Sequence, residues 1–169
     1  MKSLYIFDLD GTLALIDHRR HLVAQPECRQ CYGSVAKCVA CSQWKPNWDE
    51  FHAACIDDKP NYPVIDTMNR LRRTSDIWIF SGRSGAVRKE TDGWLHMHTE
   101  LGMYDIGYQV RMRKAGDYTP DDVLKESWYD TMSLDDKRRL VAVFDDRDRI
   151  VSMWRRRGVT CFQVAPGNF

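Results

Sequence analysis

The chain has 169 residues, of which 43% are hydrophobic and 29% are charged, and its formal net charge is +1. This length allows one domain with a sizeable core, and this composition excludes a disordered or fibrous protein. The small net charge excludes nucleic-acid binding by overall charge alone, and no apolar run approaches the roughly 20 residues that cross a bilayer. Because the first apolar run reaches Asp8 without room for a signal peptide, we expect one cytoplasmic domain over residues 1–169, with no membrane contact.

Short apolar runs alternate with helical patterns along the chain. The apolar runs predict strands at residues 4–7, 77–80, 106–112, 140–144 and 159–164, of which 106–112 is the weakest. The helical patterns predict helices at residues 64–73, 86–98, 120–132 and 147–157. Strands that alternate with helices favour parallel crossovers, so we expect an α/β fold: a Rossmann-like arrangement of three layers around a central parallel sheet.

Polar residues follow three of the expected strands at the point where each strand ends. Asp8 and Asp10 follow the first strand, Ser81-Gly82-Arg83 follows the second, and Asp145 and Asp146 follow a later one. In a parallel α/β sheet the carboxyl ends of the strands border one crevice, so we expect these side chains to converge there. Ionised carboxylates this close need a counter-charge. Mg²⁺ suits them because it binds a few carboxylates and keeps positions for water and phosphate.

This set of groups predicts phosphoryl transfer. One carboxylate can attack phosphorus and form an aspartyl-phosphate, while a second protonates the leaving oxygen and later activates water. Ser81, Arg83 and Lys125 would supply hydrogen-bond donors and positive charge to the transferring group. An Asp-x-Asp-Gly-Thr segment alone is also compatible with a plain turn after a strand, so the interpretation depends on the whole ordered set.

The ordered set resembles the four motifs of the haloacid dehalogenase superfamily of aspartate-nucleophile phosphotransferases. The matching segments are Asp8-Leu9-Asp10-Gly11-Thr12, Ser81-Gly82-Arg83, Lys125 and Asp145-Asp146. The resemblance implies that Asp8 is the nucleophile and Asp10 the general acid and base. It implies that Mg²⁺ is held by the Asp8 carboxylate, the Asp10 backbone carbonyl and Asp145, with Asp146 close by through water. The groups implied to bind the transferred phosphate are Thr12, Ser81, Gly82 and Lys125.

A narrower resemblance covers most of the chain outside residues 15–62. Segments 10–19, 80–85, 113–126 and 144–169 are similar to the phosphatase half of the phage polynucleotide kinase/3'-phosphatase family. This resemblance implies that Arg19, Arg83 and Arg113 contact the substrate phosphate or line its approach, and that Asp121 orients Lys125. Asp121 and Lys125 are four residues apart, a spacing that suits a side-chain pair on one helix face, although a solvated ion pair has the same spacing.

The chain departs from that family in two places. It has no Gly-x-x-x-x-Gly-Lys-Ser/Thr motif, so we expect no kinase activity, and it has Asn168 where the family commonly has Asp. Without a kinase half, the substrate remains open. A 3'-phosphorylated DNA or RNA end would place the enzyme in nucleic-acid repair, in the host cytoplasm if a phage encodes it, with a separate kinase or ligase as partner.

Two other functions fit the sequence. A nucleotidase or small-molecule phosphatase would keep the same chemistry and act on a mononucleotide. A non-catalytic, zinc-containing module that binds nucleic acid would need no reactive groups, and the repulsive carboxylates Asp8, Asp10 and Asp145 argue against it.

Residues 15 to about 62 interrupt the alternation of strands and helices and predict an insertion after the first strand. Four of the six cysteines, Cys28, Cys31, Cys38 and Cys41, form two Cys-x-x-Cys pairs there. Four thiolates match a structural Zn²⁺ site; reduced thiols and a redox pair are the alternatives. We expect the insertion to cover the catalytic crevice as a cysteine-rich, zinc-binding cap. Its aromatic residues Trp44, Trp48, Phe51 and His52 would either form the cap's own core or stack on a base.

Overall fold

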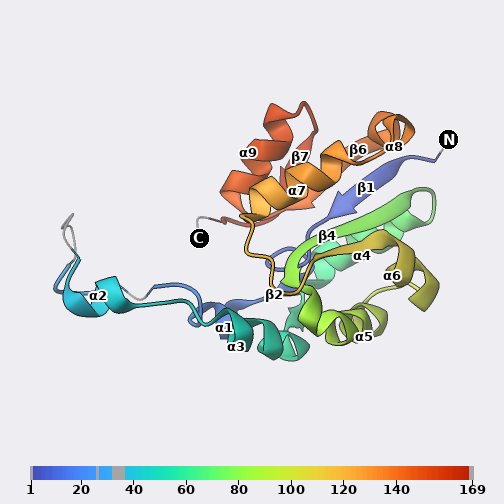
Figure 1. Ribbon diagram of the computed structural model, residues 1–169. Helices are drawn as coiled ribbons and strands as arrows, with labels where there is room; N and C mark the ends of the chain where they lie inside the picture. Colours follow the sequence, from blue (N-terminus) through green and yellow to red (C-terminus); the bar gives the residue numbers. More distant parts are fainter. Residues whose placement is uncertain (1, 26, 32–36, 168–169) are drawn as a thin grey trace.

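The computed structural model describes residues 2–25, 27–31 and 37–167, so Asn168 and most of the link between the two cysteine pairs lie outside the described residues. Its centre is a five-stranded parallel sheet with the strand order β5-β4-β1-β6-β7 (Figure 1). The strands are β1 (Leu4–Phe7), β4 (Asp76–Ser84), β5 (Val110–Arg113), β6 (Leu140–Asp145) and β7 (Cys161–Gln163). The predicted α/β fold with a central parallel sheet is confirmed.

Helices cover both faces of this sheet. Alternate residues of β4 point to opposite faces: Ile77 and Ile79 belong to one apolar cluster, and Trp78 and Phe80 pack with the other. The first cluster lies under α4 (Tyr62–Arg72), α5 (Arg88–His98) and α6 (Met103–Gln109). The second lies under α7 (Asp121–Asp130) and α9 (Asp148–Arg156). The three expected layers follow from this alternation, because the strands are apolar on both sides.

Two elements differ from the prediction. The expected strand at residues 106–112 was wrong over its first half, because α6 continues to Gln109 before β5 begins. The Asp105 carboxylate accepts a hydrogen bond from the backbone N–H of Gly102 at 3.1 Å, which caps this helix and turns Ile106 into the core. Helix α8 (Leu134–Arg139) was not predicted; the hydroxyl oxygen of Ser133 caps it by accepting from the backbone N–H of Asp136 at 3.0 Å.

The insertion begins and ends at a short antiparallel pair formed by β2 (Ala14–Leu15) and β3 (Lys59–Pro60). Between them lie α1 (Asp17–Arg20), α2 (Val39–Gln43), α3 (Trp48–Ala53) and the 3₁₀ helix η1 (Ala54–Asp57). Helices α1 and α3 lie against the body. The backbone N–H of Asn47 donates to the carbonyl of Leu22 at 2.9 Å, so this hydrogen bond joins the two ends of the segment between them. We name this segment, residues 23–46, the arm.

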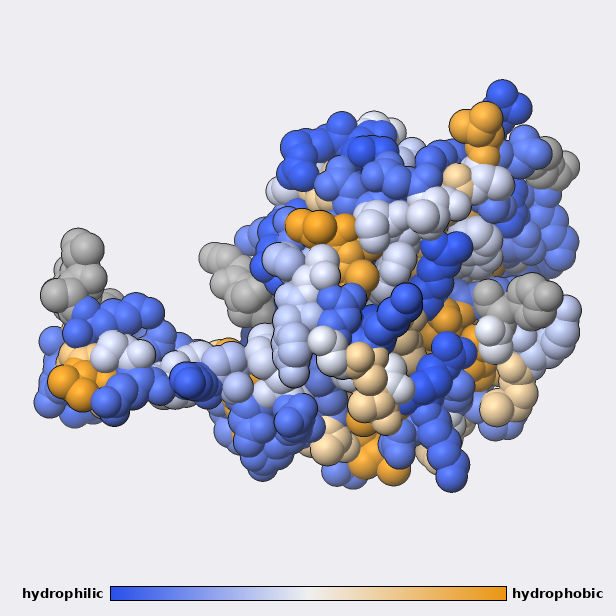
Figure 2. Space-filling model, viewed as in Figure 1, coloured by the Kyte–Doolittle hydropathy of each residue, from blue (hydrophilic) through white to orange (hydrophobic). Residues whose placement is uncertain are grey.

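The arm carries α2 away from the sheet (Figure 1). Figure 2 shows it as a separate lobe joined to the body by a narrow stalk. The described cysteine-bearing part therefore does not cover the crevice as expected, and of the insertion's described residues, those of its base lie beside the strand ends. Among the described residues, no helix is long and apolar enough to span a membrane.

Candidate active site

Asp8 directly follows β1, at the centre of the sheet. Its backbone N–H donates to the Phe144 carbonyl of β6 at 2.9 Å, which fixes the end of one strand against the next. The chain then turns sharply: the carbonyl of Leu9 accepts from the backbone N–H of Ala14 at 2.8 Å, and Gly11 has φ 88°. A Cβ at Gly11 would lie 2.1 Å from Asp146 Oδ2, so this turn needs glycine for both its backbone angle and its close approach to Asp146.

Three carboxylates meet at the ends of β1 and β6. Oxygen atoms of Asp8, Asp145 and Asp146 lie within 4.8 Å of one another, and all three residues are buried. Lys125 of α7 reaches them from the adjacent layer and donates to Asp8 Oδ1 at 2.5 Å and to Asp145 Oδ2 at 2.7 Å. The structure thus brings together the expected nucleophile, the expected lysine and the expected acidic pair.

This cluster suits a divalent cation. Burial raises the pKa of Asp8 well above its ordinary value, with the charges of Asp145 and Asp146 adding to the rise and Lys125 opposing it. Burial, with Asp145 nearby, raises the pKa of Asp146 to about 6. One ammonium group thus faces three carboxylates that repel one another. A hard cation with oxygen ligands would balance this charge, and Asp8, Asp145 and Asp146 are the residues that could hold it.

Asp10 faces away from that cluster, toward two arginines. Its Oδ1 accepts from Arg19 Nη2 at 2.8 Å and from Arg83 Nε at 3.1 Å. Burial raises the pKa of Asp10, but Arg83 and Arg19 outweigh burial and hold this pKa well below its ordinary value. Both arginines are buried, and Arg19 also lies over the Phe51 ring, 4.1 Å from its centroid. The two arginines expected to contact phosphate therefore pair with Asp10, and neither is among the residues that line the cavity above the carboxylates.

Sequence reasoning missed Asp58, whose side chain is completely buried between these arginines. Its Oδ2 accepts from Arg19 Nη2 at 2.6 Å and from Arg83 Nη2 at 2.7 Å. Nothing local distinguishes it from the exposed Asp57 beside it. Its partners lie 39 and 25 residues away, so only the folded chain shows its role.

Arg113 and Asp121 lie on the other side of the site. Asp121 accepts hydrogen bonds from Arg113 and from Arg147, a second residue that sequence reasoning missed. Arg113 Nε also donates to the Gly82 carbonyl at 2.8 Å. Lys125 affects Asp121 through its charge, while its hydrogen bonds go to Asp8 and Asp145. Asp121 thus bridges Arg113 and Arg147, and its expected role in orienting Lys125 stays a prediction.

Ser81 and Thr12 are buried beside these groups. Ser81 Oγ accepts from the backbone N–H of Arg83 at 3.2 Å, while Thr12 Oγ1 is buried without a hydrogen-bond partner among the described residues. Gly82 approaches Asp121 closely, because a Cβ there would lie 2.6 Å from Asp121 Oδ1. These residues shape the backbone around the carboxylates, and the phosphate-binding role expected for them stays a prediction.

A cavity of about 260 Å³ opens above the carboxylates. Its floor includes Asp8, Asp10 and Lys125, one part of its wall comes from α3, and another comes from the loop at residues 116–120. Among the described residues, none from 17 to 47 lines it. Within the part of the insertion that the structure describes, therefore, the base lines this cavity and the arm does not.

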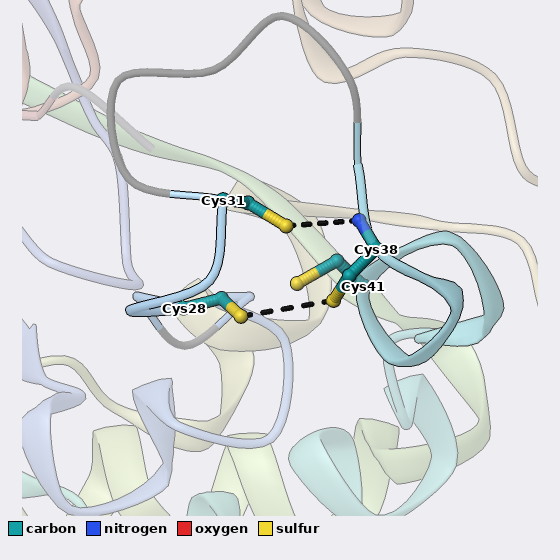
Figure 3. A group of neighbouring side chains, drawn as sticks. All are labelled: Cys28, Cys31, Cys38 and Cys41. Carbon is teal, nitrogen blue, oxygen red and sulfur yellow. Dashed lines mark hydrogen bonds between the residues drawn. The ribbon is translucent and has the colours of Figure 1, made fainter.

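Four of the six cysteines gather in the arm, with their sulfur atoms close together (Figure 3). The four sulfur atoms of Cys28, Cys31, Cys38 and Cys41 lie within 4.8 Å of one another. The Cys28 and Cys38 sulfurs are 3.7 Å apart, and the backbone N–H of Cys38 donates to the Cys31 sulfur at 2.9 Å. Four thiolates around Zn²⁺ at about 2.3 Å would be separated by about 3.8 Å, and the distance between the Cys28 and Cys38 sulfurs agrees with this spacing.

Comparisons with known proteins agree with this geometry. The sequence profile of a family described as "Polynucleotide kinase PNKP phosphatase domain" matches residues 38–169. A putative bifunctional polynucleotide kinase/RNA ligase from Autographa californica nuclear polyhedrosis virus is 27% identical over 150 residues, which cover 88% of this chain and 17% of that protein.

Solved structures show the same similarity. A chain in "Structure of the Pnkp1/Rnl/Hen1 RNA repair complex" matches with a TM-score of 0.67 and 27% identity, over 99% of this chain and 44% of that one. A haloacid dehalogenase-like hydrolase, SP0104 from Streptococcus pneumoniae, shares the fold at a TM-score of 0.56 and 10% identity, over 96% of this chain and 84% of that one. The chain spans less than half the length of the viral relative and of the repair-complex chain.

Proposed function

Because the chain belongs to the family of polynucleotide kinase PNKP phosphatase domains, we propose that it removes the 3'-terminal phosphate from a DNA or RNA end. Both resemblances predicted from the sequence, to the haloacid dehalogenase superfamily and to polynucleotide phosphatases, are confirmed. The observation that carries the proposal is the meeting of Asp8, Lys125 and Asp145 at the floor of an open cavity.

In the proposed reaction, a carboxylate oxygen of Asp8 attacks phosphorus. The bond from phosphorus to the 3' oxygen breaks, and that oxygen takes a proton from Asp10 and leaves as a hydroxyl group. Water then attacks the aspartyl-phosphate and gives its proton to Asp10, while the bond from phosphorus to Asp8 breaks. The products are inorganic phosphate and a 3'-hydroxyl end, and both aspartates return to their starting state.

Asp10 is better prepared for the second step than for the first. Arg83 and Arg19 hold its pKa low, so Asp10 is a carboxylate ready to accept the proton of the attacking water. An incoming phosphate brings negative charge beside Asp10 and raises its pKa, so Asp10 takes up a proton from solvent as the substrate binds and donates this proton in the first step. The ammonium group of Lys125 lies beside Asp8, where it would stabilise the negative charge of the transferring phosphoryl group.

The carboxylates Asp8, Asp145 and Asp146 would hold Mg²⁺. The resemblance to the haloacid dehalogenase superfamily implies the backbone carbonyl of Asp10 as a further ligand. Bound Mg²⁺ would neutralise charge on the phosphoryl group and on the carboxylates as the bond to phosphorus changes.

The test is phosphate release, with Mg²⁺ and with EDTA, from four matched substrates: a 3'-phosphorylated oligonucleotide, its 5'-phosphorylated isomer, and a 3'- and a 5'-mononucleotide. We expect fastest turnover of the 3'-phosphorylated oligonucleotide, no turnover in EDTA, and no turnover by Asp8→Asn. Asp135→Asn, at an exposed position, is the matched control and should equal wild type. Equal or faster turnover of the mononucleotides would instead identify a nucleotidase.

We also propose that Cys28, Cys31, Cys38 and Cys41 bind one structural Zn²⁺. Because four thiolates fill its coordination sphere, this Zn²⁺ would have no open position for catalysis. Element analysis by mass spectrometry should find one zinc per chain and less than a tenth of that in Cys38→Ser. A wild-type chain purified with no zinc, and unable to bind added zinc, would leave the cluster as reduced thiols.

The length of the relatives suggests partners. The viral relative is named as a kinase and ligase, and the structural match belongs to a repair complex. We propose that a kinase and a ligase act on the ends that this phosphatase produces, because ligation needs a 3'-hydroxyl group. Copurification of such activities with the full-length protein would support this.

A further inference from the structure

The cavity has room for more than a phosphate. Its volume of about 260 Å³ is close to the lower end of the roughly 300–1,000 Å³ typical of pockets that enclose small molecules. A phosphate on the floor, beside Asp8, leaves the mouth of the cavity to the group that carries it. The walls of this mouth therefore decide which phosphate monoesters are held.

Charge does not favour the backbone of a nucleic acid here. Among the described residues that line the cavity, seven are aspartates and four are Lys or Arg. Two of the four, Arg113 and Arg147, are bonded to Asp121, and Lys125 is bonded to Asp8 and Asp145. A site that held its substrate mainly through backbone phosphates would need an excess of basic groups. Beyond the phosphate that is removed, the substrate must therefore be bound through a part of the nucleotide other than the backbone phosphates.

Trp48 offers a flat surface at this mouth. It is the first residue of α3, its side chain lines the cavity, and it remains 41% exposed. The ring packs on two neighbours that also line the cavity: its centroid lies 5.7 Å from that of Phe51, edge to face, and 6.1 Å from that of His52, with the two rings stacked. Asn47 caps the helix by accepting from the backbone N–H of Glu50 at 3.2 Å, which holds in place the backbone that carries Trp48.

Tyr118 is a second aromatic residue at the same mouth, and it is 84% exposed. The backbone on both sides of it is held in place. The backbone N–H and the hydroxyl group of Thr119 donate to Asp117 Oδ1 at 2.8 and 2.6 Å, and Arg113 donates to the Thr119 carbonyl at 2.5 Å. The loop backbone would therefore lose little freedom when a flat ligand packs on the Tyr118 ring, and the ordering cost would be that of the side chain alone.

We propose that Trp48 and Tyr118 bind the terminal nucleobase of the substrate by stacking, which makes them the specificity-determining residues of this phosphatase. This inference rests on the proposed function. Stacking is tolerant of sequence, because every base has an aromatic face. It also selects a nucleotide over other phosphate monoesters without requiring a basic groove. An exposed single-stranded end fits this mode, because its last base is free to enter the mouth.

The experiment compares two 3'-phosphorylated oligonucleotides that differ only in the terminal nucleotide, which carries a base in one and is abasic in the other. We expect wild type to prefer the base-bearing substrate by about 5- to 150-fold in kcat/KM, mostly through KM, because stacking contributes about 1–3 kcal/mol per base. Trp48→Ala and Tyr118→Ala should each lose most of this preference. Trp48→Phe and Tyr118→Phe, which keep a ring, should retain most of it.

Two control variants keep the test specific. Trp44→Ala and Tyr62→Ala remove the same residue types from positions outside the cavity lining and should behave as wild type. An active wild type without a preference for the base, or alanine variants that keep that preference, would overturn the stacking proposal and leave the phosphatase proposal intact. A wild type that releases no phosphate from either oligonucleotide would overturn the proposed function, and the stacking proposal with it.

Discussion

Arg19 and Asp58 form a two-point ion pair inside the protein: Arg19 Nε donates to Asp58 Oδ1 and Arg19 Nη2 to Asp58 Oδ2, both at 2.6 Å. Arg19 belongs to α1 and Asp58 directly precedes β3, so the pair joins the two flanks of the insertion. Arg83 of β4 reaches the same carboxylate, and both arginines reach Asp10. One network thus attaches the insertion to the sheet and sets the charge state of Asp10.

Asp58→Asn should therefore affect both stability and activity. It leaves two buried guanidinium groups with Asp10 as their remaining carboxylate, and breaking a buried pair in this way costs about 3–5 kcal/mol. Denaturant unfolding should show a loss of this size, and phosphate release should fall at least tenfold. Asp57→Asn changes the neighbouring exposed residue and should leave both quantities within error. Equal behaviour of the two variants would refute a role for the network.

Two Gly→Ala substitutions should have opposite effects. Gly11 has φ 88° and approaches Asp146, so Gly11→Ala should displace the loop that carries Asp10, destabilise the fold by about 1–3 kcal/mol and abolish phosphate release. Gly93 lies within α5, and a Cβ there would meet nothing within 4 Å. Gly93→Ala should raise stability by about 0.5–1 kcal/mol with unchanged activity. Thermal unfolding and phosphate release measure both effects, and normal activity of Gly11→Ala would contradict the steric argument.

The parts predicted from the sequence were those set by local pattern. Asp8 and Asp145 were found because each ends an apolar strand, and parallel strands end on one side of a sheet. Lys125 was found because it occupies the place of a known motif. The strand predicted from Ile106 was wrong because an apolar run this short has no clear periodicity, and the cap at Gly102 favours a helix.

Other features depend on contacts between distant segments, which one sequence does not reveal. Asp58 and Arg147 look like ordinary surface residues until the chain folds, and each then bonds to partners more than 20 residues away. The direction of the arm was also missed. The cysteine pattern predicts a compact cluster, and that cluster is present, but nothing in the pattern relates it to the crevice.

The arm should be dispensable for the chemical step. The Asn47 N–H donates to the Leu22 carbonyl. If two residues replaced the 23–46 segment, this hydrogen bond would join the first and fourth residues of a β-turn. A variant with Gly-Gly in place of residues 23–46 should fold, lose its zinc, and turn over a 3'-phosphorylated dinucleotide within about twofold of wild type. A variant that keeps residues 23–46 and carries Cys28→Ser and Cys31→Ser tests the effect of losing the metal separately from the effect of losing the segment. Complete loss of turnover in the deletion variant, with the fold intact by circular dichroism, would show that the arm acts at the site.

Lys125→Met should separate the stability of the carboxylate cluster from its chemistry. Burial lowers the pKa of Lys125, but the carboxylates of Asp145 and Asp8 outweigh burial and raise this pKa above its ordinary value, so the ammonium group is charged. Without it, the buried carboxylates Asp8 and Asp145 lose their direct ion pair, and we expect a loss of about 3–5 kcal/mol in EDTA. Mg²⁺ at about 100 times its dissociation constant should return about 2.7 kcal/mol if only the folded state binds it, while phosphate release stays absent. Thermal unfolding with and without Mg²⁺ measures this, and Lys89→Met, at an exposed position of α5, is the control. A Lys125→Met variant whose stability does not respond to Mg²⁺ would argue that the three carboxylates do not bind the ion.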